Sequence, residues 1–105
     1  MIYAGIDLGG TTIKGALVNE EGKILRAKSV PTRGERPHRE VVKDMADLIV
    51  ELAKEEGLAP EEIKTVGIGS PGSIDPIGGR IIFAGNFADF RNVPMVAIMQ
   101  ETLPN

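Results

Sequence analysis

The sequence predicts an α/β domain built in layers on a mixed sheet, which opens as a meander of three antiparallel strands. Three observations support this fold class. Apolar, β-prone runs at 2–8, 12–18 and 23–30 are separated by turns with the sequences Gly-Gly and Asn-Glu-Glu-Gly. Between 39 and 56, apolar residues recur at helical spacing. A short apolar strand at 65–69 follows this helix, so strands and helix alternate as an α/β domain requires.

Shorter elements are predicted for the rest of the chain. Polar, glycine-rich or proline-rich stretches are typical of loops, and they fall at 32–37, 70–79 and 86–92. We also expect a helical turn at 60–63, a strand at 80–83, and a helix at 95–103, with Pro94 at a position that is typical of the start of a helix.

Composition narrows the class of protein. The chain has 105 residues, so we expect at most one domain, and its hydrophobic content of 42% supports a real core. The net charge of −3, with both signs mixed along the chain, argues against a nucleic-acid surface. The absence of cysteine excludes disulfides, thiolate metal sites and a thiol nucleophile. We find no signal-peptide pattern and no apolar stretch long enough for a bilayer, which predicts a soluble, cytoplasmic chain.

The strongest chemical signal is the turn between the first two predicted strands. Gly9 and Gly10 allow backbone N–H groups to approach an anion without side-chain obstruction. Thr11 and Thr12 add hydroxyl donors, and Lys14 adds a positive charge. Together these residues predict a cradle for phosphate.

Asp7 stands in the middle of an otherwise apolar strand. A buried carboxylate is costly unless it is paired or lies near a cation, so we expect Asp7 to hold Mg²⁺, directly or through water. The simpler alternative is an ordinary Gly-Gly hairpin in which Asp7 caps a turn. Either feature alone favours that alternative, whereas the whole string favours phosphate binding.

The residues 5–14, Gly-Ile-Asp-Leu-Gly-Gly-Thr-Thr-Ile-Lys, resemble the first phosphate motif of the ROK family of bacterial sugar kinases and repressors. The residues 67–75, Gly-Ile-Gly-Ser-Pro-Gly-Ser-Ile-Asp, resemble the sugar-loop motif of that family. A third likeness runs from Gly79-Arg80-Ile81-Ile82 to Asn86-Phe87, and residues 93–104 resemble the helix before the family's catalytic strand. The resemblance covers the whole chain, in the family's order and spacing.

This resemblance implies the N-terminal lobe of an actin/hexokinase-like (ribonuclease H-like) fold. It also implies ATP-dependent phosphorylation of a hexose, with glucose as the first candidate substrate and glycolysis as the pathway. The ATP phosphates would face Gly9, Gly10, Thr11, Thr12 and Lys14, with Asp7 at Mg²⁺; Gly72, Ser73 and Asn86 would line the sugar side. Ser73 departs from the proline that many glucokinases of the family carry, which weakens the assignment of glucose. The resemblance also implies that the parent protein forms a homo-oligomer, namely a dimer.

The family's catalytic base is an aspartate in an Asn-Asp-Ala-Asn string on the strand after the last helix seen here. Phosphoryl transfer to a sugar hydroxyl needs such a carboxylate to accept the proton. Residues 1–105 contain no such string. By resemblance, the chain is therefore expected to be a partial N-terminal domain of a kinase about three times as long, and inactive on its own.

The sequence offers two alternative functions. The residues 67–72 fit the dinucleotide fingerprint G-x-G-x-x-G, but Pro71, Pro76, Gly78 and Gly79 prevent the helix that this fingerprint requires. A sugar-responsive regulator or non-catalytic sugar sensor is the alternative to the kinase. The intact phosphate string, and a first strand that begins at residue 2 with no basic recognition helix before it, favour the kinase.

Several other polar residues are expected to be structural. We expect His38, Asp44 and Asp47 to be solvated, and Asp75 to be a turn residue in which a sugar contact stays open. Asp89 is equally ambiguous. Met95 and Met99, at helical spacing, are expected in the core.

Overall fold

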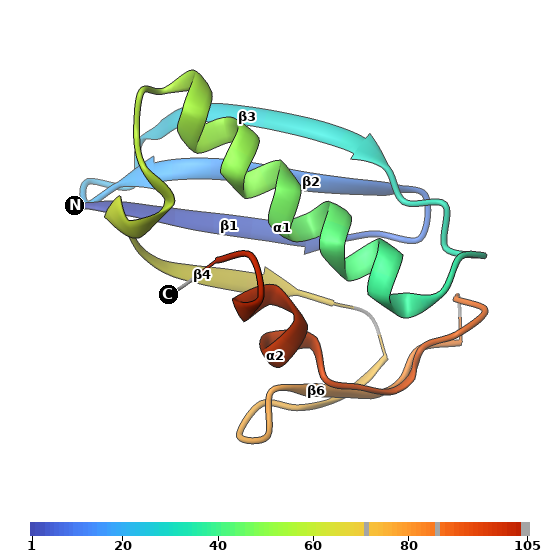
Figure 1. Ribbon diagram of the computed structural model, residues 1–105. Coiled ribbons are helices and arrows are strands. Elements are labelled where there is room, and N and C mark those ends of the chain that lie inside the picture. The colour runs from blue at the N-terminus through green and yellow to red at the C-terminus, as the bar shows by residue number, and fades with distance from the viewer. Residues whose placement is uncertain (71, 86, 104–105) are drawn as a thin grey trace.

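The computed structural model describes residues 1–70, 72–85 and 87–103, and its larger sheet is the mixed sheet that the sequence predicts. Four strands lie in the order β3-β2-β1-β4 (Figure 1). Their bounds are Ile2–Leu8 for β1, Thr12–Asn19 for β2, Ile24–Pro31 for β3 and Ile63–Gly69 for β4. β1 pairs antiparallel with β2, and β2 with β3, whereas β4 pairs parallel with β1. The predicted meander is confirmed.

Helix α1 (His38–Glu55) lies across one face of this sheet (Figure 1) and forms the main core with it. Its buried side chains are spaced as one helical stripe: Val41, Val42, Met45, Ala46, Leu48, Ile49, Leu52 and Ala53. Each fully buried aliphatic side chain of this kind stabilises the fold by about 1.5–3 kcal/mol. The helix lies so close to the sheet at Gly15 that a Cβ atom on this residue would be only 2.9 Å from Leu48 Cδ2. A larger residue at position 15 would push the layers apart.

The second half of the described chain adds a small sheet and a second helix. After the 3₁₀ turn η1 (Pro60–Glu62) and β4 come β5 (Ser73–Asp75), β6 (Arg80–Phe83), β7 (Arg91–Val93) and α2 (Met95–Gln100). The strand order is β5-β6-β7, and both pairs are antiparallel. The methionines of α2, Met95 and Met99, are buried as expected.

Three predictions for this half are corrected by the structure. The sequence predicts loops at 70–79 and 86–92, but the first stretch contains β5 and the second runs into β7, and both of these strands pair with β6. Such short strands show no alternation in sequence, and their pairing with β6 overrides the local turn signals. The last helix begins at Met95, as predicted, but it ends at Gln100 rather than at residue 103.

The face of the large sheet opposite α1 carries mostly small side chains. Side chains alternate along a strand, so Ala4, Ile6 and Leu8 face the core while Gly5 and Asp7 face the other way. Asp7 is exposed there, as is Lys14. The expectation of a buried Asp7 is therefore wrong for this chain: the strand is apolar on one face only.

Strand β3 is attached to α1 by a cluster of charges. Lys28 Nζ lies 2.6 Å from Glu51 Oε1 and 2.5 Å from Glu55 Oε2. Arg26 adds contacts of 3.2 Å to Glu55 and 2.8 Å to Glu56. The Lys28 ammonium, followed by Arg26, holds the pKa of Glu55 below its ordinary value of 4.5. The carboxylates, Glu51 first, raise the pKa of Lys28 above 10.5.

We expect this cluster to make the stability of the chain depend on acid pH. Because the pKa of Glu55 is lowered on folding, its contribution is complete above 4.5 and is lost as pH falls through the folded pKa. In urea unfolding, Lys28→Met should therefore cost most near neutral pH, and the difference from wild type should shrink in acid. Lys43→Met, which removes an exposed i,i+4 partner of Asp47, is the control and should change little. An equal cost of Lys28→Met at neutral and acid pH would contradict this account.

None of the helices in the described part of the chain combines the length and the apolar character needed to cross a bilayer.

Candidate phosphate-binding hairpin

The connection between β1 and β2 is a tight turn closed by its own backbone. The Gly9 N–H donates to the Thr12 carbonyl at 3.0 Å. A Cβ atom on Gly9 would lie 2.7 Å from that same carbonyl oxygen, so the turn requires glycine at this position. Within the described residues, the N–H groups of Gly10 and Thr11 donate no hydrogen bond to the protein. The turn thus presents backbone donors, as a phosphate-binding hairpin must.

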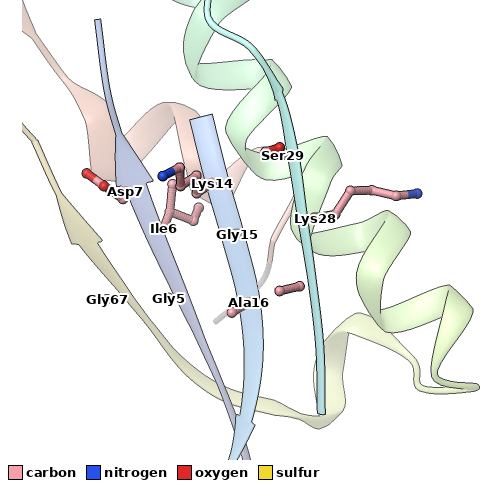
Figure 2. Close-up of a pocket in the computed structure, with 10 residues that line it drawn as sticks. Gly5, Ile6, Asp7, Lys14, Gly15, Ala16, Lys28, Ser29 and Gly67 are labelled. Atoms are coloured by element: carbon pink, nitrogen blue, oxygen red, sulfur yellow. The ribbon is translucent and has the colours of Figure 1, made fainter. Parts of the chain in front are cut away.

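Two opposite charges lie directly across from each other just before and after this turn. Asp7 and Lys14 are paired residues of β1 and β2, and Figure 2 shows them on the neighbouring strands. Beside them, the open face of the sheet is hollowed by about 600 Å³. Its lining is mostly small: Gly5, Ile6, Asp7, Lys14, Gly15, Ala16, Ala27, Lys28, Ser29 and Gly67. The structure therefore brings Asp7, Lys14 and the glycine turn together at one end of a shallow hollow.

A residue that the sequence did not indicate fixes the turn from the inside. Thr32, which follows β3, has no exposed surface and is the buried polar residue of the described core. Its hydroxyl donates to the Gly9 carbonyl at 2.8 Å, and its N–H donates to the Thr11 carbonyl at 2.9 Å. A threonine after a strand-ending proline is too common to signal such a contact, because its partner lies 23 positions away in sequence.

Arg36 attaches Thr32 to helix α1. Its Nη2 atom donates to the Thr32 carbonyl and to Asp44 Oδ2, both at 2.8 Å, and its Nε donates to the Arg33 carbonyl at 3.1 Å. The prediction that Asp44 is merely solvated is therefore wrong, because it anchors this arginine. Asp47, also predicted as solvated, is exposed but pairs with Lys43 at 3.0 Å.

The residues predicted for the sugar side are placed only in part. Gly72 has φ +87°, and a Cβ atom there would lie 2.1 Å from the Phe83 carbonyl oxygen, so the backbone itself requires glycine. Ser73 is exposed at the start of β5, opposite Phe83. Asn86 lies outside the described residues.

Residues 84–85 and 87–90 lie at the same end of the molecule as the glycine turn, beyond the carboxyl ends of the parallel strands β1 and β4 (Figure 1). The loop at 32–37 lies between them. It holds the turn through Thr32, while Ala88 N–H donates to the Gly34 carbonyl at 3.1 Å. Phe87 stacks on Phe90, with ring centroids 4.4 Å apart. Ligands of open α/β sheets bind at this kind of position.

His38 is not a solvated loop residue as predicted. It is the first residue of α1, and Asp89 Oδ2 lies 2.9 Å from its backbone N and 3.0 Å from its Nδ1. The backbone N–H of His38 is the main cause that lowers the pKa of Asp89 below 3.8. Asp75, predicted as a turn residue, is the last residue of β5, and its side chain accepts the Gly78 N–H of the turn that follows, which lowers its pKa.

No group of three or more His, Cys, Asp or Glu side chains in the described ranges is arranged to hold a metal ion. A cluster of this kind, made of protein ligands alone, is one arrangement that holds a metal ion. Mg²⁺ is, however, often held by one or two carboxylates together with the phosphates of a nucleotide. The exposed carboxylate of Asp7, beside the glycine turn, fits that second arrangement.

The mixed β3-β2-β1-β4 sheet, with a glycine turn between β1 and β2, defines a lobe of the actin/hexokinase-like class. The ROK family matches residues 3–104. A glucokinase from Thermotoga maritima is 44% identical over 91 residues, which cover 87% of this chain and 27% of the relative. The chain belongs to the ROK family.

Solved structures agree with the fold. A ROK hexokinase from Thermus thermophilus superposes over the whole chain and 33% of its own length, with TM-score 0.84 and 28% identity. A ROK family glucokinase from Streptomyces griseus, solved with glucose and AMPPNP, matches 99% of this chain and 31% of its own, with TM-score 0.83 and 28% identity. The chain thus spans about a third, or less, of the length of these relatives.

A regulator is also among the relatives. A xylose repressor from Caldicellulosiruptor bescii is 30% identical over 97 residues, which cover 92% of this chain and 24% of the repressor. Sequence similarity over this lobe is therefore shared by kinases and regulators of the family.

Proposed function

We propose that this chain supplies the nucleotide-phosphate hairpin and part of the sugar site of an ATP-dependent sugar kinase. The observation that carries the proposal is the glycine turn with two donor N–H groups, flanked by Asp7 on one strand and Lys14 on the next. The similarity to a Thermotoga maritima glucokinase, and to a glucokinase solved with glucose and AMPPNP, supports the same function.

In this proposal, each group has one physical task. Catalysis of phosphoryl transfer consists mainly of positioning and of electrostatic stabilisation of the phosphate oxygens. The N–H groups of Gly10 and Thr11 would bind those oxygens, with the Thr11 and Thr12 hydroxyls and the Lys14 ammonium adding donors. Asp7 would hold Mg²⁺, which supplies charge neutralisation at the phosphates when it is bound.

The hexose is proposed to lie beside Gly72, Ser73 and Asn86, and glucose is the proposed hexose. The carboxylate that accepts the proton of the sugar hydroxyl is proposed to belong to a part of the parent protein beyond residues 1–105. These residues would then be a partial domain that does not turn over alone. We further propose a cytoplasmic, homo-oligomeric parent that acts in glycolysis.

A regulator or sugar sensor is the second candidate, and the similarity to a xylose repressor is the observation that favours it. The intact glycine turn weighs against it, because a protein that only senses sugar needs no nucleotide-phosphate site.

The decisive experiment is a coupled assay of sugar phosphorylation by the full-length protein, with ATP, Mg²⁺ and a panel of hexoses. We expect turnover with at least one hexose, and none from residues 1–105 tested alone. A full-length protein that binds a hexose but never phosphorylates it would overturn the kinase proposal in favour of the sensor.

A further inference from the structure

We propose that Thr32 is a positioning residue of the nucleotide site, acting through the backbone of the glycine turn. This inference rests on the proposed function and adds a residue to it. Thr32 itself is buried and touches no substrate; its effect would pass through the Gly9 peptide group, whose carbonyl accepts the Thr32 hydroxyl at 2.8 Å.

The geometry of a trans peptide carries the argument. The carbonyl of one residue and the N–H of the next lie in one plane and point in opposite directions. No cis peptide occurs among the described residues. Because the Gly9 carbonyl is directed toward Thr32, the Gly10 N–H is directed away from it, out of the turn. The hydroxyl of Thr32 thereby sets the direction of a donor that the proposed function assigns to phosphate.

The two glycines of the turn cannot themselves fix the direction of the Gly10 N–H. Gly9 and Gly10 have the widest choice of backbone angles, so the peptide between them rotates more freely than any other unless something holds it. Two hydrogen bonds from Thr32 do so, one to the Gly9 carbonyl and one to the Thr11 carbonyl. They fix the peptide groups on both sides of the Gly10–Thr11 peptide, which leaves the donors of Gly10 and Thr11 aligned before a ligand arrives.

Thr32 is in turn fixed to the rigid part of the fold. Arg36, whose side chain is only 14% exposed, links the Thr32 carbonyl to Asp44 on α1. The charge-assisted contact to Asp44 and the packing of α1 against the sheet therefore hold Thr32 in register with the turn. A binding loop whose donors are preorganised in this way loses less entropy when it binds.

The test compares Thr32→Val with Thr32→Ser in the full-length protein. Valine keeps the shape and the backbone N–H of threonine but leaves the Gly9 carbonyl without the Thr32 hydroxyl, whereas serine keeps the hydroxyl. We expect Thr32→Val to raise the KM for ATP about fivefold to tenfold, as loss of one such hydrogen bond implies. The KM for the hexose should stay unchanged in Thr32→Val, and Thr32→Ser should have the wild-type KM for ATP.

Calorimetric titration with AMPPNP and Mg²⁺, and circular dichroism of each variant, complete the experiment. If Thr32→Val lowers the melting temperature but binds nucleotide as wild type does, the residue is structural and the inference is overturned. An equal rise in both KM values would also overturn it, because the effect would not be specific to the turn. If the wild-type protein neither binds nucleotide nor phosphorylates sugar, the proposed function fails first, and this inference with it.

Discussion

Asp7→Asn in the full-length protein is expected to lower the kcat for hexose phosphorylation by about a hundredfold or more, the usual cost of removing one group that stabilises charge at the reacting centre. Asparagine has nearly the shape of aspartate but lacks the negative charge that Mg²⁺ requires. Because Asp7 is exposed on the open face of the sheet, the fold should tolerate the change. The melting temperature should therefore stay close to that of wild type.

The matched control is Asp47→Asn, which removes an exposed carboxylate from the outer face of α1. Its kcat should equal that of wild type. If Asp7→Asn keeps wild-type kcat and the same dependence on Mg²⁺ concentration, Asp7 does not hold the metal, and its assignment is wrong.

Gly72→Ala should destabilise the chain by about 2–5 kcal/mol, the sum of a left-handed backbone penalty and an overpacking penalty. The φ angle of Gly72 is +87°, which residues with a Cβ atom rarely adopt. The new methyl group would also lie 2.1 Å from the Phe83 carbonyl oxygen and 2.9 Å from Ala84 Cα. Both are backbone atoms, so relief requires the strand β6 to move.

Gly57→Ala separates the two penalties. Gly57 has a similar φ of +73°, but a Cβ atom there would meet nothing within 4 Å. Gly57→Ala should therefore lower the free energy of unfolding only by the left-handed backbone penalty, about 1–2 kcal/mol. Urea unfolding followed by circular dichroism measures both variants. Equal losses for Gly72→Ala and Gly57→Ala would show that the close contact between Gly72 and β6 does not exist in solution.

The glycine turn and Gly72 illustrate what the sequence could and could not predict. The glycine turn and its flanking charges are local in sequence, and the structure brings Asp7, Gly9 and Lys14 together as predicted. For Gly72 the sequence predicted a sugar contact, whereas the structure supplies a backbone reason for glycine that depends on Phe83. A local motif therefore predicts which residues lie near one another, but it does not give the structural reason for each residue.

The fold was predictable wherever one periodicity runs through a whole element. The strands β1 to β3 and the helix α1 alternate or repeat over seven or more residues, and each was predicted within about one residue of its bounds. The strands β5 and β7 have three residues each and exist because they pair with β6. Nothing within three residues distinguishes such a strand from a loop.

Contacts between distant segments were also beyond the sequence. Thr32 reaches Gly9 across 23 positions, and His38 reaches Asp89 across 51. In the sequence, each of these residues has the signature of an ordinary loop residue. Their roles follow only once the loop at 32–37 is seen between the glycine turn and residues 87–90.

The central claim, that the glycine turn binds nucleotide phosphate, is tested most directly by amide hydrogen exchange in the full-length protein. Exchange at Gly10 and Thr11 should be measured with and without AMPPNP and Mg²⁺, in the presence of a hexose. We predict that both amides exchange more slowly when the nucleotide is bound, because their N–H groups then donate to phosphate oxygens. If the nucleotide binds while both amides exchange at an unchanged rate, the phosphates lie elsewhere and the claim is contradicted.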